Sequence, residues 1–113
     1  MQFGMPTLIE NRNLEENAEL CSELGLDFLE LNMNMPMYQV DKIGNIHGLM
    51  ELAEKYGIYY TIHLDENLNV CDFNPLVAEA YMETTERALK AAVALGAPLL
   101  NMHMNHGIYV TLP

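Results

Sequence analysis

The chain has 113 residues, which is enough for one domain with a modest hydrophobic core and too few for two. Half of the residues are hydrophobic, which excludes a disordered chain, and no apolar run reaches the roughly 18 residues that span a bilayer. Sixteen acidic residues against five basic ones give a formal net charge of −11, which repels phosphate backbones, so no nucleic acid is expected as a partner. The N-terminus lacks a signal-peptide pattern, and Cys21 and Cys71 do not form a close metal-type pair. We therefore expect a cytoplasmic protein with two free thiols.

The first part of the chain predicts a strand followed by a helix. Residues 2–9 have a strand pattern that Pro6 weakens, because proline within a sheet is confined to edges and irregular ends. Asn13 is a good N-cap for the helix that follows. This helix is predicted over 14–24 and ends at Gly25. Its apolar stripe comprises Leu14, Ala18, Cys21 and Leu24.

The next segment, residues 27–33, alternates as a strand does, with successive side chains on opposite sides of a sheet. One face is apolar (Leu29, Leu31, Met33), and the other is more polar (Phe28, Glu30, Asn32). A long irregular stretch, 34–44, separates this strand from a helix predicted over 45–56, which Gly57 ends. The apolar face of the helix comprises Ile46, Leu49, Met50 and Ala53.

The third strand, residues 58–64, shows the alternation most clearly. Its apolar face comprises Ile58, Tyr60, Ile62 and Leu64, and its other face comprises Tyr59, Thr61 and His63. An acidic and amide-rich loop, 65–73, follows. Asn74-Pro75 is a strong helix start, a capping residue followed by proline at the first helical position. The helix is predicted over 75–95, with Val77, Tyr81, Thr84, Ala88, Ala92 and Leu95 on one stripe.

The last predicted strand is 98–104. Leu100, Met102 and Met104 lie on one face, and Leu99, Asn101 and His103 lie on the other. A turn at Asn105-His106-Gly107 then leads into residues 108–113.

Strands and helices alternate along the chain, which predicts a parallel sheet with right-handed crossovers. The strand-to-helix joints are long, and such loops at the carboxyl ends of parallel strands are where α/β proteins place their sites. In an open doubly wound sheet both strand faces would be mainly apolar. Here one face turns polar toward the carboxyl end, which favours an α/β fold of the (β/α)8 TIM-barrel type. A full barrel takes about 250 residues, so four parallel strands and three helices predict that residues 1–113 are the N-terminal half of such a domain.

Four segments resemble the xylose-isomerase-like TIM barrels, the sugar phosphate isomerase/epimerase family, which is related to the metal-dependent apurinic-site endonucleases. They are Gly4-Met5-Pro6-Thr7-Leu8-Ile9-Glu10, Phe28-Leu29-Glu30-Leu31-Asn32, Tyr60-Thr61-Ile62-His63-Leu64 and Asn101-Met102-His103-Met104. The resemblance runs along nearly the whole chain and would cover the first half of the family's barrel. It implies a divalent metal (Mn, Zn, Co or Mg) that polarises a sugar carbonyl or hydroxyl while acidic residues move a proton.

The resemblance also implies roles for five polar residues at the strand ends. Glu30 would lie at the barrel mouth as the catalytic carboxylate. His63 and His103 match zinc ligands of the endonuclease branch, and in the sugar branch the matching positions contact substrate or lie near the metal. Asn32 and Asn101 would bind substrate or position their neighbours. Most metal carboxylates of the family come from strands five to eight, so we expect an incomplete site and little activity from this chain alone.

Several of these residues also have a simpler explanation. The two strand-end histidines could be satisfied polar residues of the barrel lumen. The loop carboxylates Asp65, Glu66 and Asp72 could bind a cation, but an acidic loop is usually a solvated surface. His47, on a helix, and His106, beside a glycine in a turn, are also readily explained as solvated side chains.

Three functions from different classes remain open. The first is a metal-dependent sugar or sugar-phosphate isomerase or epimerase of carbohydrate metabolism, acting on a small-molecule carbohydrate. The second is a hydrolase that cleaves DNA at abasic sites, which the net charge of −11 disfavours. The third is a non-catalytic half-barrel that forms a homo-oligomer through its exposed sheet edges.

Overall fold

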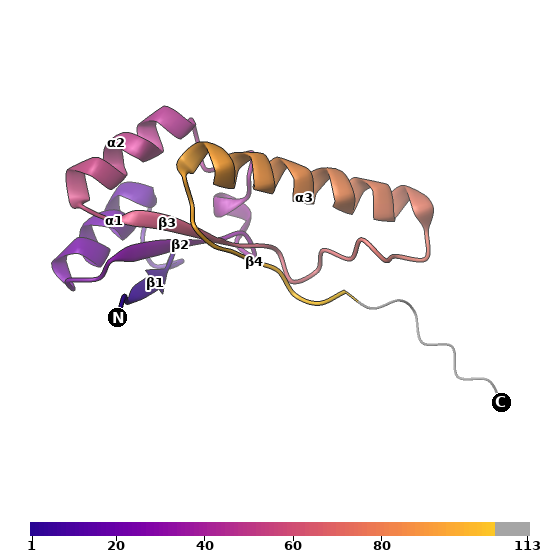
Figure 1. Ribbon diagram of the computed structural model, residues 1–113, viewed down its shortest axis with the longest axis horizontal. Coiled ribbons are helices and arrows are strands. Elements are labelled where there is room, and N and C mark those ends of the chain that lie inside the picture. The colour runs from indigo at the N-terminus through magenta and orange to yellow at the C-terminus, as the bar shows by residue number, and fades with distance from the viewer. Residues whose placement is uncertain (106–113) are drawn as a thin grey trace.

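The computed structural model describes residues 1–105. In chain order the elements are β1 (Gly4–Pro6), α1 (Leu14–Glu23), β2 (Phe28–Asn32), the short 3-10 helix η1 (Pro36–Tyr38), α2 (Ile46–Tyr56), β3 (Tyr59–His63), α3 (Pro75–Leu95) and β4 (Leu100–Asn101). The strands form one parallel sheet in the order β1-β2-β3-β4, so each strand pairs with the next in the chain. Figure 1 shows α2 and α3 along one side of this sheet. The predicted architecture of four parallel strands and three α-helices is confirmed for the described residues.

The hydrophobic core lies between the sheet and the three helices. The segments of β2 and β3 contribute their predicted apolar faces: Leu29, Leu31, Met33, Ile58, Tyr60, Ile62 and Leu64 are all buried. The helices contribute small side chains, which bring them close to the sheet: Ala18, Cys21, Ala88, Ala91 and Ala92, together with Leu49. Burying each large apolar side chain stabilises the fold by about 1.5–3 kcal/mol. The alternation of the strands therefore fixes which side of the sheet the helices cover.

The helix ends are set by local capping. Asn13, Asn45 and Asn74 are the N-caps of the three helices, and each side chain accepts a hydrogen bond from a backbone N–H in the first turn. Helices α2 and α3 end at Gly57 and Gly96, both with φ of 65°, a left-handed conformation that glycine adopts without steric cost. These signals are local in sequence, so the predicted helix boundaries agree with the structure to within one residue.

The two edge strands are shorter than predicted. Residues 2–9 contain only the three-residue β1, and residues 98–104 contain only the two-residue β4. Each has a partner on one side only. Strand β1 ends at Pro6 although β2 continues to Asn32, and β4 pairs only with Ile62 and His63 of β3. Met102 and Met104 consequently do not extend the apolar face of β4, and they are 43% and 92% exposed.

Three residues assigned to the apolar stripes of helices are exposed. Leu24, the C-cap of α1, is 61% exposed, and Met50 of α2 is 51% exposed. In α3 the stripe passes through Thr85 rather than the exposed Thr84. The Thr85 hydroxyl donates to the Tyr81 carbonyl at 2.9 Å, which satisfies it within the helix.

A buried polar network that the sequence analysis missed fixes the β1–α1 loop. Asn17 is fully buried, and its amide oxygen accepts from the Leu8 backbone N–H at 2.8 Å and from the Asn11 side chain at 2.9 Å. Its amide nitrogen donates to the Asn13 carbonyl at 2.8 Å and to the Tyr38 hydroxyl at 2.9 Å. The network joins α1 to the 3-10 helix across the core.

The remaining expectations concern the thiols, a membrane span and the C-terminal turn. Cys21 is buried, Cys71 is exposed, and both are free thiols. Among residues 1–105, no helix is both long and apolar enough to cross a membrane. His106 and residues 108–113 lie outside the described residues.

Candidate functional site

The polar residues predicted at the strand ends lie on the side of the sheet opposite the core. In the parallel register Glu30 pairs with Thr61, Asn32 pairs with His63, and His63 pairs with Asn101. Residues paired in register point to the same side of a sheet. The carboxyl ends of β2, β3 and β4 therefore bring this set together on one surface.

Glu30 and Asn101 are in direct contact across β3. The Asn101 side-chain amide donates to Glu30 Oε2 at 2.8 Å, and the two residues are 71 positions apart in the chain. Thr61 lies between them on the same face, is 2% exposed, and its hydroxyl oxygen has no hydrogen-bond partner in the described structure. The contact holds Oε2 of Glu30, and among the described residues no hydrogen bond reaches Oε1. Such a carboxylate can accept a proton at a fixed place.

His63, Glu66 and His103 form a second cluster at the same end of the sheet. The two imidazole rings lie edge to face with centroids 5.2 Å apart, and His103 Nε2 is 3.6 Å from Glu66 Oε1. His63 Nδ1 lies 2.9 Å from the Leu64 carbonyl, a contact in which this nitrogen must be the donor. Nε2 of His63 is then the unprotonated nitrogen of the neutral ring, with a lone pair for a metal or a substrate hydroxyl.

This cluster fits a divalent metal ion. One ligand atom from each of the three residues lies within 4.8 Å of the other two. Metal–ligand bonds of about 2.0–2.2 Å hold the ligand atoms of one ion within roughly 4 Å of each other. The exposed Glu66 and His103 side chains can rotate to shorten the present separation to that value. Two imidazoles and one carboxylate also match the ligand set of catalytic zinc sites, and the His63 contact with a backbone carbonyl is typical of metal-bound histidines.

The Asn32 side chain is held by the loop that follows β2. Its side-chain oxygen accepts from the Asn34 backbone N–H at 3.1 Å, and its own N–H donates to the buried Thr7 hydroxyl at 3.1 Å. Asn34 in turn accepts from the Glu66 backbone N–H at 2.7 Å, which places Glu66 beside the histidines. The sequence indicates Asp65, Glu66 and Asp72 as loop carboxylates that could bind a cation or be solvated. Of these three, the structure brings Glu66 beside the two histidines.

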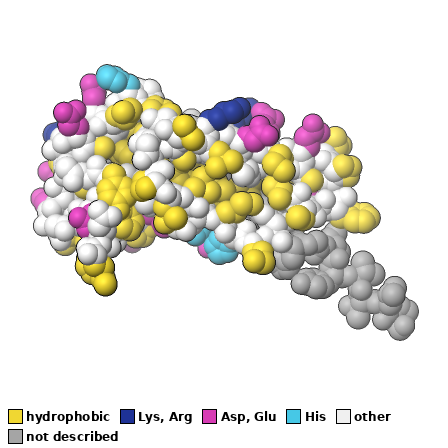
Figure 2. Space-filling view, in the orientation of Figure 1, with side chains coloured by type: hydrophobic (Ala, Val, Ile, Leu, Met, Phe, Trp, Pro, Cys, Tyr) yellow, Lys and Arg dark blue, Asp and Glu magenta, His cyan; other side chains and the backbone are white. Residues whose placement is uncertain are grey.

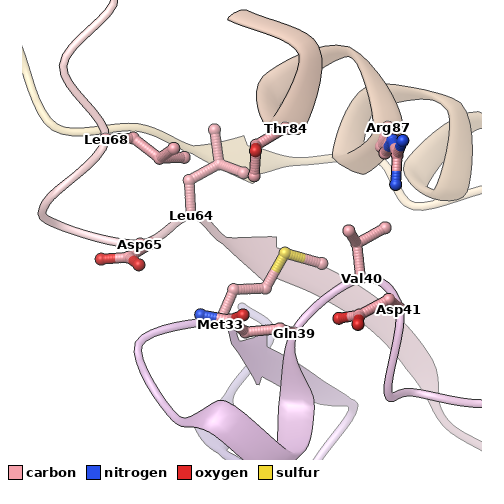
Figure 3. Close-up of a pocket in the computed structure, with 9 residues that line it drawn as sticks. All are labelled: Met33, Gln39, Val40, Asp41, Leu64, Asp65, Leu68, Thr84 and Arg87. Carbon is pink, nitrogen blue, oxygen red and sulfur yellow. The ribbon is translucent and has the colours of Figure 1, made fainter. Parts of the chain in front are cut away.

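Two hollows lie near the carboxyl end of the sheet. One, of about 250 Å³, opens beside the histidine cluster and is lined by Glu66, Asn67, Leu68, Asn69, His103, Met104 and Asn105. The other, of about 180 Å³, lies between α3 and the loops after β2 and β3, and Figure 3 shows Arg87, Asp41 and Asp65 around its apolar floor. This second pocket includes the loop carboxylate Asp65 but none of the predicted strand-end residues, which are Glu30, Asn32, His63, Asn101 and His103. The first hollow is therefore the one associated with the polar strand ends.

Comparisons with known proteins place the fold. No family model matches the sequence, and no curated protein matches it. The structure is similar to a D-tagatose 3-epimerase-like protein, with a TM-score of 0.70 and 26% identity over 88% of this chain. It is also similar to the 3-keto-D-glucoside 4-epimerase YcjR from E. coli, with a TM-score of 0.67 and 17% identity over 88% of the chain. A third match, D-psicose 3-epimerase in the presence of D-fructose, has a TM-score of 0.61 and 17% identity over 86% of the chain.

These matches define the chain as a half barrel of the TIM type. The chain spans 36% of the length of each of the three proteins. All three are sugar epimerases of the xylose-isomerase-like TIM-barrel type, so the resemblance noted in the sequence is confirmed. The chain therefore has the fold that these proteins share over the matched part of their length.

Proposed function

We propose that residues 1–113 are the N-terminal half of a metal-dependent sugar or sugar-phosphate isomerase or epimerase. The observation that carries this proposal is the Glu30–Asn101 contact on the sheet face that a closed barrel encloses. A hydrogen-bonded carboxylate at the mouth of such a barrel is suited to proton transfer on a bound carbohydrate. The free thiols of Cys21 and Cys71 are typical of a reducing compartment, and we place the protein in the cytoplasm.

The proposed reaction is removal and return of a proton beside a ketone. D-Tagatose is a 2-ketose, so a 3-epimerase inverts the carbon next to the carbonyl, and hydrogen on such a carbon is acidic. The name of the first similar structure therefore suggests this chemistry for our chain. Glu30 would accept the proton from one face of the sugar at Oε1 while Asn101 holds Oε2. Inversion then requires a second acid, outside residues 1–113, that delivers a proton to the opposite face of the carbon. Asn101 and Asn32 would also donate hydrogen bonds to sugar hydroxyls.

The histidine cluster would hold the divalent metal. His63, Glu66 and His103 would be its ligands, with Nε2 of His63 aimed by the contact of Nδ1 with the Leu64 carbonyl. When bound, the ion supplies a positive charge that stabilises negative charge on a sugar oxygen. The two exposed ligands, Glu66 and His103, line the hollow beside the cluster and could also contact substrate.

Hydrogen exchange at carbon tests the proton transfer. The full product of the gene that encodes this chain is incubated in D2O with D-tagatose or D-psicose and Mn²⁺, and NMR follows deuterium uptake at carbon 3. We expect exchange that Glu30→Gln slows by about 100-fold or more. Glu54→Gln, a change on the exposed surface of α2, is the control and should leave the rate unchanged. No exchange with any ketose, with or without metal, would overturn the proposal.

Metal binding is tested on the 113-residue chain itself. We expect Zn²⁺ to raise the melting temperature and Co²⁺ to give a visible absorption band, and His63→Gln should abolish both. His47→Gln is the matched control, because His47 pairs with Glu51 at 3.2 Å on α2 without a third ligand. Equal metal responses of the two variants would exclude the cluster as the binding site.

The histidine cluster also favours a second candidate, a hydrolase that cleaves at abasic sites. His63 and His103 match zinc-ligand positions of that branch, and the structure brings them together with Glu66. The net charge of −11 opposes DNA binding. Binding of a fluorescent abasic duplex at low salt distinguishes the two candidates, and a failure to bind removes the hydrolase.

A further inference from the structure

The pocket between α3 and the loops that follow β2 and β3 lies outside the candidate site and has a volume of about 180 Å³. Its floor is apolar and consists of Met33, Val40, Leu64 and Leu68. Met33, Leu64 and Leu68 are buried, so the floor is part of the hydrophobic core. An apolar cavity of about 150 Å³ holds one benzene molecule. The pocket therefore has room for one hydrocarbon group of about four to six carbons.

Two side chains of opposite charge lie at the mouth of this pocket. Figure 3 shows Arg87 of α3 pointing across the pocket toward the loop that carries Asp41. Among residues 1–105 the two do not form an ion pair: Arg87 contacts Glu83, and Asp41 lies 3.8 Å from Lys42. Both of these contacts are exposed, so solvent weakens them, and Figure 2 shows basic and acidic side chains together on the surface over α3. A guanidinium has five N–H donors, so Arg87 can bind a second acceptor while it contacts Glu83.

The pocket is on the side of α3 that faces α2. Leu95 of α3 lines another pocket together with Met50 and Ala53 of α2, which identifies that side. At about 100° per residue, Thr84 and Arg87 lie only about 20° and 80° around the helix from Leu95. Each strand of the sheet pairs with the next in the chain, so further strands and helices of a barrel would follow beyond β4, on the other flank of α3. A longer chain therefore adds its helices away from this pocket.

The charges at the mouth restrict the class of ligand. The remaining acidic residue of the pocket, Asp65, is directed toward its own loop, because its Oδ1 accepts from the Asn67 backbone N–H at 2.8 Å. A ligand with only a carboxylate would bind Arg87 but be repelled by Asp41. A ligand with only an ammonium group would bind Asp41 but be repelled by Arg87. Both residues are matched by a ligand that carries an ammonium and a carboxylate beside a hydrocarbon group.

We propose that this pocket binds a free aliphatic α-amino acid such as leucine. The carboxylate of the ligand accepts charge-assisted hydrogen bonds from Arg87, its ammonium donates to Asp41, and its side chain packs on the apolar floor. Leu68 also lines the hollow beside the histidine cluster, so the bound amino acid contacts the loop that carries Glu66. The ligand lies beside the candidate site and not in it. The inference is therefore independent of the proposed sugar chemistry.

Isothermal titration calorimetry with L-leucine tests this proposal on the full product of the gene that encodes this chain. We expect saturable binding of one leucine per chain. Three probes each lack one part of leucine: 3-methylbutylamine lacks the carboxylate, 4-methylpentanoate lacks the ammonium, and glycine lacks the side chain. Each probe should bind at least about tenfold more weakly than leucine, because one charged contact or the packing on the floor is lost.

A matched pair of arginine variants locates the binding. Arg87→Gln should weaken leucine binding at least about tenfold. Arg12→Gln is the control and should leave it unchanged, because Arg12 also pairs with a glutamate four residues away but does not line the pocket. Both arginines are exposed, so neither change should disturb the fold. The absence of saturable leucine binding up to about 10 mM would overturn the proposal. Equal effects of the two variants would also overturn it, and so would 3-methylbutylamine binding as tightly as leucine.

Discussion

The two faces of the sheet differ in composition although they come from the same strands. On the helix-covered face, Leu29, Leu31 and Ile62 are fully buried in the hydrophobic core. On the other face, Glu30 and His63 are half-buried and engaged in polar contacts. The apolar face of the strands therefore stabilises the fold, and the polar face holds the residues of the candidate site.

The first prediction concerns the covered face and has the largest expected effect. Leu31→Ala removes a fully buried side chain from the centre of the sheet and leaves a cavity, which should cost about 2–5 kcal/mol of unfolding free energy. Leu99→Ala, on the uncovered face and 52% exposed, should cost less than about 1 kcal/mol. Urea denaturation followed by circular dichroism measures both. Similar losses from the two variants would show that the uncovered face is packed in solution.

The second prediction concerns a polar group on the covered side. Asn17→Leu nearly keeps the volume of the side chain but removes one hydrogen-bond partner from the Leu8 N–H, the Asn13 carbonyl and the Tyr38 hydroxyl. This loss should lower the free energy of unfolding by about 2–3 kcal/mol. The exposed Asn67→Leu is the control and should change stability by less than about 0.5 kcal/mol. Equal effects in urea denaturation would mean that the network contributes no stability.

The helices and the apolar strand faces could be predicted because their signals are local. An asparagine before each helix and a glycine after it mark the ends within a few residues, and alternation marks the buried face of each strand. The lengths of β1 and β4 could not be predicted in this way. They depend on where pairing with the neighbouring strand begins and stops, which the pattern of the strand itself does not contain.

The candidate site was predictable as a location but not as a set of contacts. Alternation placed Glu30, His63 and Asn101 on one face at the strand ends. The Glu30–Asn101 hydrogen bond joins residues 71 positions apart and depends on the parallel register. Glu66 joins the histidines because Asn34 holds its backbone, a loop-to-loop contact without periodicity. The roles of these residues stay predictions that the exchange and metal-binding experiments test.

The third prediction concerns Tyr60, whose hydroxyl is buried on the covered face and donates to the Leu49 carbonyl at 2.8 Å. Tyr60→Phe should lower the free energy of unfolding by about 1 kcal/mol at neutral pH. Burial raises the pKa of Tyr60 to about 12, from an ordinary value of 10.0. Below pH 10 the phenol is neutral in both states. Between pH 10 and 12 it ionises first in the unfolded chain, so stability falls as pH rises through this window.

Tyr60→Phe should lose less stability than the native chain over that alkaline window, as measured by urea denaturation at a series of pH values. Cys21 adds a similar alkaline loss in both proteins, because burial, and then the charge of Asp27, raises the pKa of its thiol. A Cys21→Ala background in both chains therefore isolates the tyrosine. Parallel pH profiles in that background would contradict the prediction.

The last prediction concerns the smallest change in the free energy of unfolding, and this change is a gain in stability. Thr61 lies on the uncovered face beside the Glu30–Asn101 contact, and its buried hydroxyl has no hydrogen-bond partner among residues 1–105. Valine has the same shape without the hydroxyl, so Thr61→Val removes an unsatisfied group and should stabilise the chain by about 0.5–1 kcal/mol. Thr85→Val is the control, because that hydroxyl donates to the Tyr81 carbonyl at 2.9 Å and its loss should not stabilise. A loss of stability in Thr61→Val would mean that this hydroxyl has a hydrogen-bond partner in solution. Slower deuterium uptake at carbon 3 of the ketose in the same variant would place that partner in the candidate site.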